Sequence, residues 1–181
     1  MTDPTAEANE ARERFASTKE YITADRSLSP EGKKERIAAA REAANAIIAK
    51  VRSDVEKAAA GRRAALELAL LSVPTSVFGT PADKIAAAAS YRDAITRAGM
   101  TVTPDELLAL QDTAMMTGDK LLARATLAVG IQRGDIAAVD GYSAAHPQME
   151  ADVDELFEMT HTTTRNAVAN AFRHELAFGP V

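Results

Sequence analysis

The residues with the clearest capacity for chemistry are Glu158 and His161, which stand three positions apart. On a helix this spacing places a carboxylate and an imidazole on one face, and such pairs supply ligands to di-iron centres in helical bundles. Those centres need a second pair of the same kind. The residues three positions before His146 and His174 are a serine and an alanine, so the second pair is missing. We therefore expect no metal site and interpret these side chains as ordinary polar residues.

No other part of the sequence has the spacing of a catalytic centre. The chain contains no cysteine, which excludes a thiol nucleophile, a disulfide and a thiolate metal site together. It also lacks a glycine-rich phosphate loop, a nucleophile elbow and a zinc-protease histidine pair. We expect no catalytic residues, no cofactor and no enzymatic activity.

The composition favours helices with little apolar area in each. Of the 181 residues 39 are alanines, tryptophan is absent and aromatic residues make up 4%. Alanine has the highest helix propensity of all residues, but its burial removes little surface from water. Such helices gain stability by close packing, so we expect long helices that pack against one another or against other chains.

Helix starts are marked by a capping residue followed by proline, and helix ends by glycine. Thr80-Pro81 and Thr103-Pro104 are each followed by an acidic residue that completes a capping box. No segment alternates polar and apolar residues as a strand does. The sequence predicts an all-α fold with helices over residues 4–24, 30–72, 80–99, 103–118, 119–133 and 135–144, and a last long helix that Pro147 opens.

Apolar residues recur at steps of three and four along the first two helices, which is the spacing of helices that pack lengthwise against a partner. The first helix carries this stripe up to Asp25, and the second carries it well past residue 50. We predict that both stripes contact other protein. The predicted interface residues are Phe15, Ile22, Ile37, Ile47, Val51 and Val55.

The predicted domains are an extended helical hairpin over residues 1–72, comparable to a coiled-coil arm, and a compact helical domain over 73–181. A continuous helix over 30–72 would extend roughly 65 Å, well beyond a compact domain of this size. Gly61 is its weak point, because glycine costs about 1 kcal/mol relative to alanine inside a helix. The alternative is two helices that break near Gly61 and fold into one bundle.

The charge of the chain argues against nucleic acid as a partner, and its hydropathy argues against a membrane. The net charge is −5, and residues 73–181 contain 8 Lys and Arg against 14 Asp and Glu. The helices around 81–98 and 104–116 could form a helix-turn-helix, but the second has no basic residue and phosphates would repel it. The longest apolar stretch, residues 64–73, is too short to span a bilayer. The first 13 residues lack the apolar core of a signal peptide, so we expect no secretion by that route.

Two stretches resemble a known group of proteins. Residues 25–37 read DRSLSPEGKKERI, and residues 123–142 read ARATLAVGIQRGDIAAVDGY, with His146-Pro147 following. They resemble small helical proteins encoded among the virion-structure genes of tailed phages and prophages of actinobacteria. The resemblance covers about 33 residues and carries over no catalytic residue. It implies a role in head assembly or decoration through symmetric repetition, a capsid or connector protein or a second copy as partner, and a location in the virion or the host cytoplasm.

A second hypothesis is a small ligand-binding or regulatory helical domain. Its site would lie near Met115, Met116, Tyr142 and Met159 in the second half of the chain. Methionine is a flexible apolar side chain that more often fills a core than lines a pocket. We therefore favour the structural or assembly protein.

Overall fold

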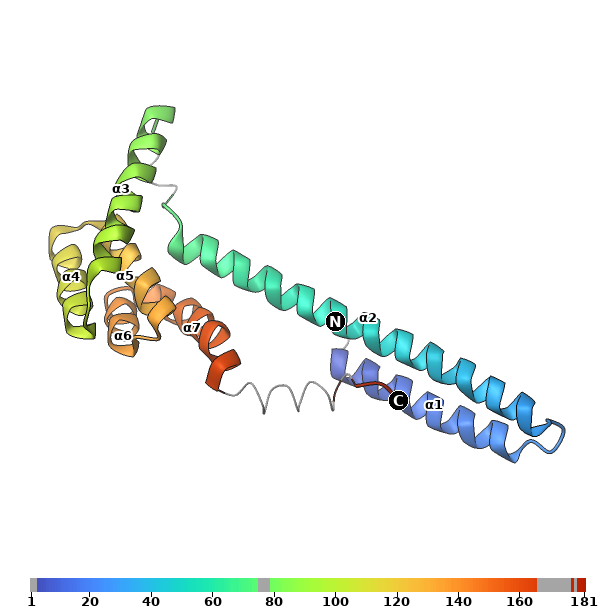
Figure 1. The fold of residues 1–181 in the computed structure, drawn as a ribbon. Helices are drawn as coiled ribbons and strands as arrows, with labels where there is room; N and C mark the ends of the chain where they lie inside the picture. Colours follow the sequence, from blue (N-terminus) through green and yellow to red (C-terminus); the bar gives the residue numbers. More distant parts are fainter. Residues whose placement is uncertain (1–2, 75–78, 166–176, 178) are drawn as a thin grey trace. The chain divides into compact units, whose positions relative to one another are not determined.

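The computed structural model describes residues 3–74, 79–165, 177 and 179–181. This part of the chain is all-helical and contains no strand, as the sequence predicts (Figure 1). None of its helices carries an apolar run long enough to cross a bilayer. The elements are α1 (Pro4–Ala24), α2 (Pro30–Leu71), α3 (Pro81–Met100), α4 (Pro104–Thr117), α5 (Lys120–Arg133), α6 (Ile136–Ala145), the 3₁₀ turn η2 (Pro147–Met149) and α7 (Glu150–Arg165).

The helix ends form where local signals place them. Asp3 accepts a hydrogen bond from the amide of Thr5 at 2.9 Å and caps α1. Thr103 forms the expected capping box at the start of α4. Gly118 and Gly134 end α4 and α5 with φ of 70° and 72°, a left-handed conformation that glycine adopts without steric cost.

Helix α2 runs unbroken through Gly61. All ten residues of the stretch 56–65 are exposed, so packing does not hold this part of the helix in place. Its stability comes from alanine propensity and from ion pairs four residues apart that flank or enter the stretch. These pairs are Lys50 with Asp54 at 2.8 Å, Arg52 with Glu56 at 3.1 Å and Arg63 with Glu67 at 2.8 Å.

Gly61→Ala is expected to stabilise this stretch by about 1 kcal/mol. A Cβ built on Gly61 meets no atom within 4 Å, so the gain in helix propensity has no steric cost to offset it. Amide hydrogen exchange in residues 56–65 should slow by roughly fivefold. The measurement is exchange followed by mass spectrometry, and unchanged or faster exchange would contradict the expectation.

The chain divides into two compact units within α2. One comprises residues 1–61 and 166–181, and the other residues 62–165. In the first unit α1 lies antiparallel to the first part of α2 (Figure 1), and Ala8, Ala11 and Ile48 form a small buried cluster between them. The domain boundary predicted at residue 72 coincides with the end of α2 and stays a prediction.

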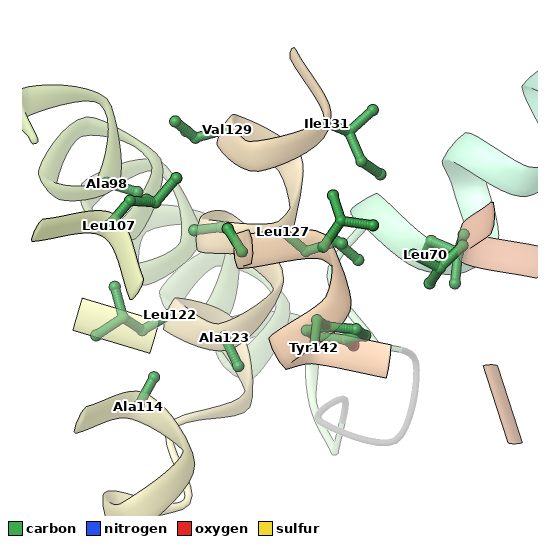
Figure 2. Packing of buried hydrophobic residues seen from close by; sticks show 14 of the residues in the cluster. Leu70, Ala98, Leu107, Ala114, Leu122, Ala123, Leu127, Val129, Ile131 and Tyr142 are labelled. Carbon is green, nitrogen blue, oxygen red and sulfur yellow. The ribbon is translucent and has the colours of Figure 1, made fainter. Parts of the chain in front are cut away.

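Helix α5 is the centre of the second unit. Eight of its residues are buried, and α3, α4, α6 and α7 all pack against it (Figure 2). Leu127 and Thr126 are completely inaccessible, and Leu66 and Leu70 from the end of α2 join the same core. Alanines such as Ala98, Ala114 and Ala123 let the helix backbones approach closely, because a methyl group needs little room.

Two side chains from other helices occupy the carboxyl end of α2. The guanidinium of Arg124 donates to the carbonyls of Ala69, Leu70 and Ser72 at 2.7, 3.2 and 3.0 Å. The hydroxyl of Tyr91 donates to the carbonyl of Leu71. The last carbonyls of a helix have no partner within it, and a cation there also offsets the negative end of the helix dipole. The end of α2 is thereby fixed to α3 and α5.

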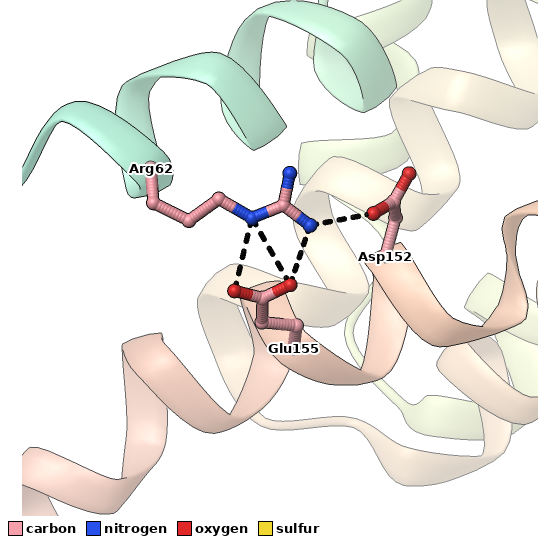
Figure 3. A network of polar contacts seen from close by, with 3 residues as sticks. All are labelled: Arg62, Asp152 and Glu155. Carbon is pink, nitrogen blue, oxygen red and sulfur yellow. Dashed lines mark hydrogen bonds and ion pairs between the residues drawn. The ribbon is translucent and has the colours of Figure 1, made fainter. Parts of the chain in front are cut away.

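Arg62 joins α2 to α7 through a forked ion pair (Figure 3). Its Nε and Nη2 lie 3.0 and 2.5 Å from the two carboxylate oxygens of Glu155, and its Nη2 is also 2.8 Å from Asp152. The hydrogen bonds from Arg62 hold the pKa of Glu155 below its ordinary value. Planar arginine matches a carboxylate with two parallel bonds, so this contact fixes orientation as well as distance.

Arg62→Ala is expected to speed amide exchange in the first turns of α7 by at least about threefold, since it removes a contact between helices. Arg63→Ala is the matched control, because Arg63 pairs with Glu67 on the same helix. Exchange mass spectrometry of both variants tests this. Equal effects on α7 would show that the fork contributes nothing specific to its position.

Candidate interaction surfaces

The hairpin of α1 and α2 buries part of the predicted interface within the chain. Ile22 and Val51 are 7% and 4% exposed, and Phe15, Ile37 and Val55 are half-buried. Ile47 is 38% exposed, whereas its neighbour Ile48 is 1% exposed and takes the buried place in the stripe. The two helices of one copy therefore cover much of the stripe and leave a residual apolar edge.

The turn end of the hairpin carries a basic groove of 470 Å³. Lys33 crosses to α1 by donating to the carbonyl of Thr23 at 2.7 Å, and the guanidinium of Arg41 lies 5.8 Å from the ring centre of Phe15. Both cations thus make contacts within the hairpin, and that of Arg41 is a cation–π contact at an exposed site. Ile37 lines the same groove and supplies its apolar wall.

The histidine of the Glu158–His161 pair has a structural contact in the second unit. His161 Nε2 bonds to the carbonyl of Ile131 near the end of α5, and its ring lies 4.7 Å from that of Phe157. Glu158 is exposed. Within the described residues there is no group of three or more His, Cys, Asp or Glu side chains arranged for a metal ion. His174 lies outside the described residues.

The residues of the ligand-binding hypothesis do not gather at one place. Met115 and Met159 pack against the core, while Met116 is 81% exposed. Tyr142 is buried and stacks on His146 with ring centres 4.2 Å apart, and both line a pocket of 260 Å³ with Arg124. Burial raises the pKa of the Tyr142 hydroxyl, while Arg124 opposes the rise. Met115, Met116 and Met159 do not line this pocket.

An apolar surface that sequence reasoning missed lies at the turn between α3 and α4. Met100 and Val102 are 75% and 84% exposed, and Met100 lines a shallow hollow of 560 Å³ whose other lining residues are Ala109, Leu110, Arg97, Thr101, Glu106 and Thr113. We call Met100, Val102, Ala109 and Leu110 the α3–α4 surface. A signal was present in the sequence, because Met100 and Val102 are large apolar residues within three positions of the capping residue Thr103, where a turn is usually polar.

Hydrogen bonds from α5 and from the first turn of α4 hold the turn in place. Arg133 donates to the carbonyl of Gly99 at 2.8 Å and to the hydroxyl of Thr101 at 3.1 Å. Glu106 accepts from the amides of Val102 and Thr103 at 2.6 and 3.3 Å. The exposed side chains of the α3–α4 surface are therefore presented by ordered backbone, which lowers the entropy lost when a partner binds.

Acid is expected to loosen this turn. The hydrogen bonds from Val102 and then Thr103 hold the pKa of Glu106 below its ordinary value of 4.5. Because the pKa of Glu106 is lower in the folded than in the unfolded state, its ionised carboxylate stabilises the fold fully at pH values above the unfolded-state pKa. This stability is lost as the pH falls through the folded-state pKa. Melting of the wild type and of Glu106→Gln from about pH 6 to about pH 3 tests this. The difference in Tm between the wild type and Glu106→Gln should decrease below pH 4.5. A difference that does not change with pH would contradict this role of Glu106.

Comparison of the chain with protein-family models, with curated proteins and with solved structures found no match.

Proposed function

We propose that this chain is a non-enzymatic structural or assembly protein that binds other protein through helix–helix contacts. The observation that carries the proposal is the α3–α4 surface, where Met100 and Val102 are both more than 70% exposed on backbone held by Arg133 and Glu106. Met100 shares the lining of one hollow with Ala109 and Leu110, and large apolar side chains exposed together on an ordered turn are more typical of a protein interface than scattered ones.

The hairpin supports the same proposal from a different part of the chain. Its two helices cover Ile22 and Val51 but leave Ile47 exposed and Phe15 half-buried. The remaining apolar edge suits the side of another helix, with the charges around it setting register and contributing little energy. Exposed Tyr21, at 76%, adds an aromatic side chain to α1, and such residues are enriched at interfaces.

Within this class we propose that the chain acts as a capsid-associated protein of a tailed phage. The support is the resemblance of residues 25–37 and 123–142, together with the all-helical fold. A protein repeated many times in a symmetric particle needs few strong contacts in each copy, because multivalency raises the overall affinity. The partner is then a capsid or connector protein or a second copy of the chain.

Light scattering and sedimentation of the purified chain against concentration test the proposal. Val102→Asp should weaken self-association, or binding to a purified capsid partner, by at least about tenfold, because it places a charge among the exposed apolar side chains of the turn. Ile85→Asp is the matched control, since Ile85 is 72% exposed on the same helix pair but lies outside the α3–α4 surface.

Two results would overturn the proposal. One is a strictly monomeric wild type at millimolar concentration that also fails to bind purified capsid and connector proteins. The other is an equal loss of association in Val102→Asp and Ile85→Asp, which would show that the α3–α4 surface has no special role.

A further inference from the structure

The pocket of 260 Å³ beside Tyr142 lies among the first turn of α5, the end of α6 and η2, all within the second unit. Lys120, Arg124, His146 and Gln148 supply its nitrogen-bearing side chains, and among the described residues no acidic one lines it. Residues 73–181 as a whole contain 8 Lys and Arg against 14 Asp and Glu. A positive pocket in an acidic part of the chain favours an anionic ligand.

Two positive charges stand together on one wall of this pocket. Lys120 and Arg124 are four positions apart on α5, so their side chains lie on the same face of the helix. Lys120 makes no hydrogen bond or ion pair within the described part of the chain. Arg124 uses only Nη1 to bond to the last carbonyls of α2, which leaves Nη2 and Nε for another acceptor. The adjacent acid, Asp119, bonds to the amide of Leu122 at 3.0 Å and lies outside the lining.

The opposite side of the lining comes from the turn between α6 and η2. His146 Nδ1 lies 3.1 Å from the carbonyl of Tyr142, and because a carbonyl only accepts, Nδ1 is the donor. This bond and the stacking on Tyr142 hold the imidazole in place, while Nε2 bonds to none of the described residues. In the imidazolium form both ring nitrogens donate, so Nε2 can then bond to an anion. The Gln148 amide is likewise without a partner among the residues described.

We propose that this pocket binds the phosphate group of a small phosphate monoester. Such a group carries a charge of about −1.5 to −2 at pH 7 and three strong acceptor oxygens. Its charge matches Lys120 and Arg124, and its oxygens point in different directions, as the donors on α5 and on the α6–η2 turn require. A carboxylate is planar and suits a single fork of donors better.

The size of the pocket limits the rest of the ligand. Its volume equals that of roughly nine water molecules at about 30 Å³ each, which suits a phosphate with a short carbon chain. Ala123 and Met149 supply apolar lining for such a chain. The pocket shares no lining residue with the α3–α4 surface, so this inference does not rest on the proposed function.

Two exposed lining residues give variants that leave the core untouched. Lys120→Gln removes one positive charge, and Gln148→Glu adds a negative charge with almost no change in size. Arg124 is left unchanged because it also fixes the end of α2. Arg92→Gln and Gln132→Glu are the matched controls, since both residues are exposed in the same unit and lie outside the pocket.

Isothermal titration calorimetry of the full-length chain at constant ionic strength tests the proposal, with inorganic phosphate and glycerol 3-phosphate as probes. The wild type should bind both with a Kd below about 1 mM. Lys120→Gln and Gln148→Glu should each weaken binding by at least about fivefold, because each changes a charge in contact with the ligand. The two controls should change it by less than about twofold, since salt screens distant charges.

Three results would overturn the proposal. The first is a wild type that binds neither probe at concentrations up to about 10 mM. The second is an equal loss of binding in the lining variants and in their controls. The third is binding of succinate, a dianion with planar carboxylates, as tightly as glycerol 3-phosphate. None of these results bears on the assembly role, which is measured separately through Val102→Asp.

Discussion

Leu127→Ala should lower the free energy of unfolding of the second unit by about 2–5 kcal/mol. Leu127 has no exposed surface, and it lies on α5, the helix against which α3, α4, α6 and α7 pack. Removing three carbon atoms there loses their transfer from water and leaves a cavity that the surrounding helices fill only in part. Amide exchange of α5 and α6 in native buffer measures the change within this unit.

Two matched variants bound the expected effect. Leu127→Met keeps most of the volume and should cost less than about 1.5 kcal/mol. Ile136→Ala removes a comparable side chain that is 54% exposed and should cost less than about 1 kcal/mol. If Leu127→Ala were no more destabilising than Ile136→Ala, the packing around α5 would have to differ from that shown in Figure 2.

Gly130→Leu should destabilise the second unit by about 1–3 kcal/mol through overpacking. A Cβ on Gly130 would lie 3.0 Å from the Cβ of Ala138 and 3.8 Å from Cγ2 of Val139, so even one methyl group forces α5 and α6 apart slightly. A leucine side chain adds three more carbon atoms to that contact. Urea unfolding followed by circular dichroism, with amide exchange in α6, measures the loss.

Gly61→Leu is the control that separates packing from helix propensity. It makes the same change in a helix where the new Cβ meets no atom within 4 Å, so it should stabilise its stretch by several tenths of a kcal/mol. Opposite signs at Gly61 and Gly130 are the expected result. Stabilisation at both positions would show that α5 and α6 do not approach as closely as described.

Helix boundaries could be predicted because their causes are local. The capping boxes at Thr80 and Thr103 join a side chain to a backbone amide three residues away, and the structure confirms both. Gly118 and Gly134 end their helices as expected. Pro147 was expected to open the last long helix, but a 3₁₀ turn comes first. His146 supplies no side-chain cap there, and the amide of Met149 bonds to the carbonyl of His146 at 2.8 Å instead.

Which side chains of a helix face its neighbour was harder to predict than the helices themselves. Ile47 and Ile48 are adjacent isoleucines about 100° apart around the helix, and both fit a spacing of three or four. The position of α1 decides between them, and it buries Ile48. The docking of Gly179 on Arg12 joins residues 167 apart in sequence, so no local pattern could indicate it.

Arg124, which lies on α5 and donates to the last carbonyls of α2, has a consequence for how the chain folds during synthesis. The carbonyls that Arg124 occupies belong to residues 52 to 55 positions earlier. During synthesis from the amino end, the last turn of α2 emerges well before the residue that completes it, and translation at roughly 5–20 residues per second leaves it uncapped for several seconds. The carbonyls of Ala69 and Leu70 therefore stay hydrated until Arg124 has been made, so this end of α2 cannot dock on α5 before then.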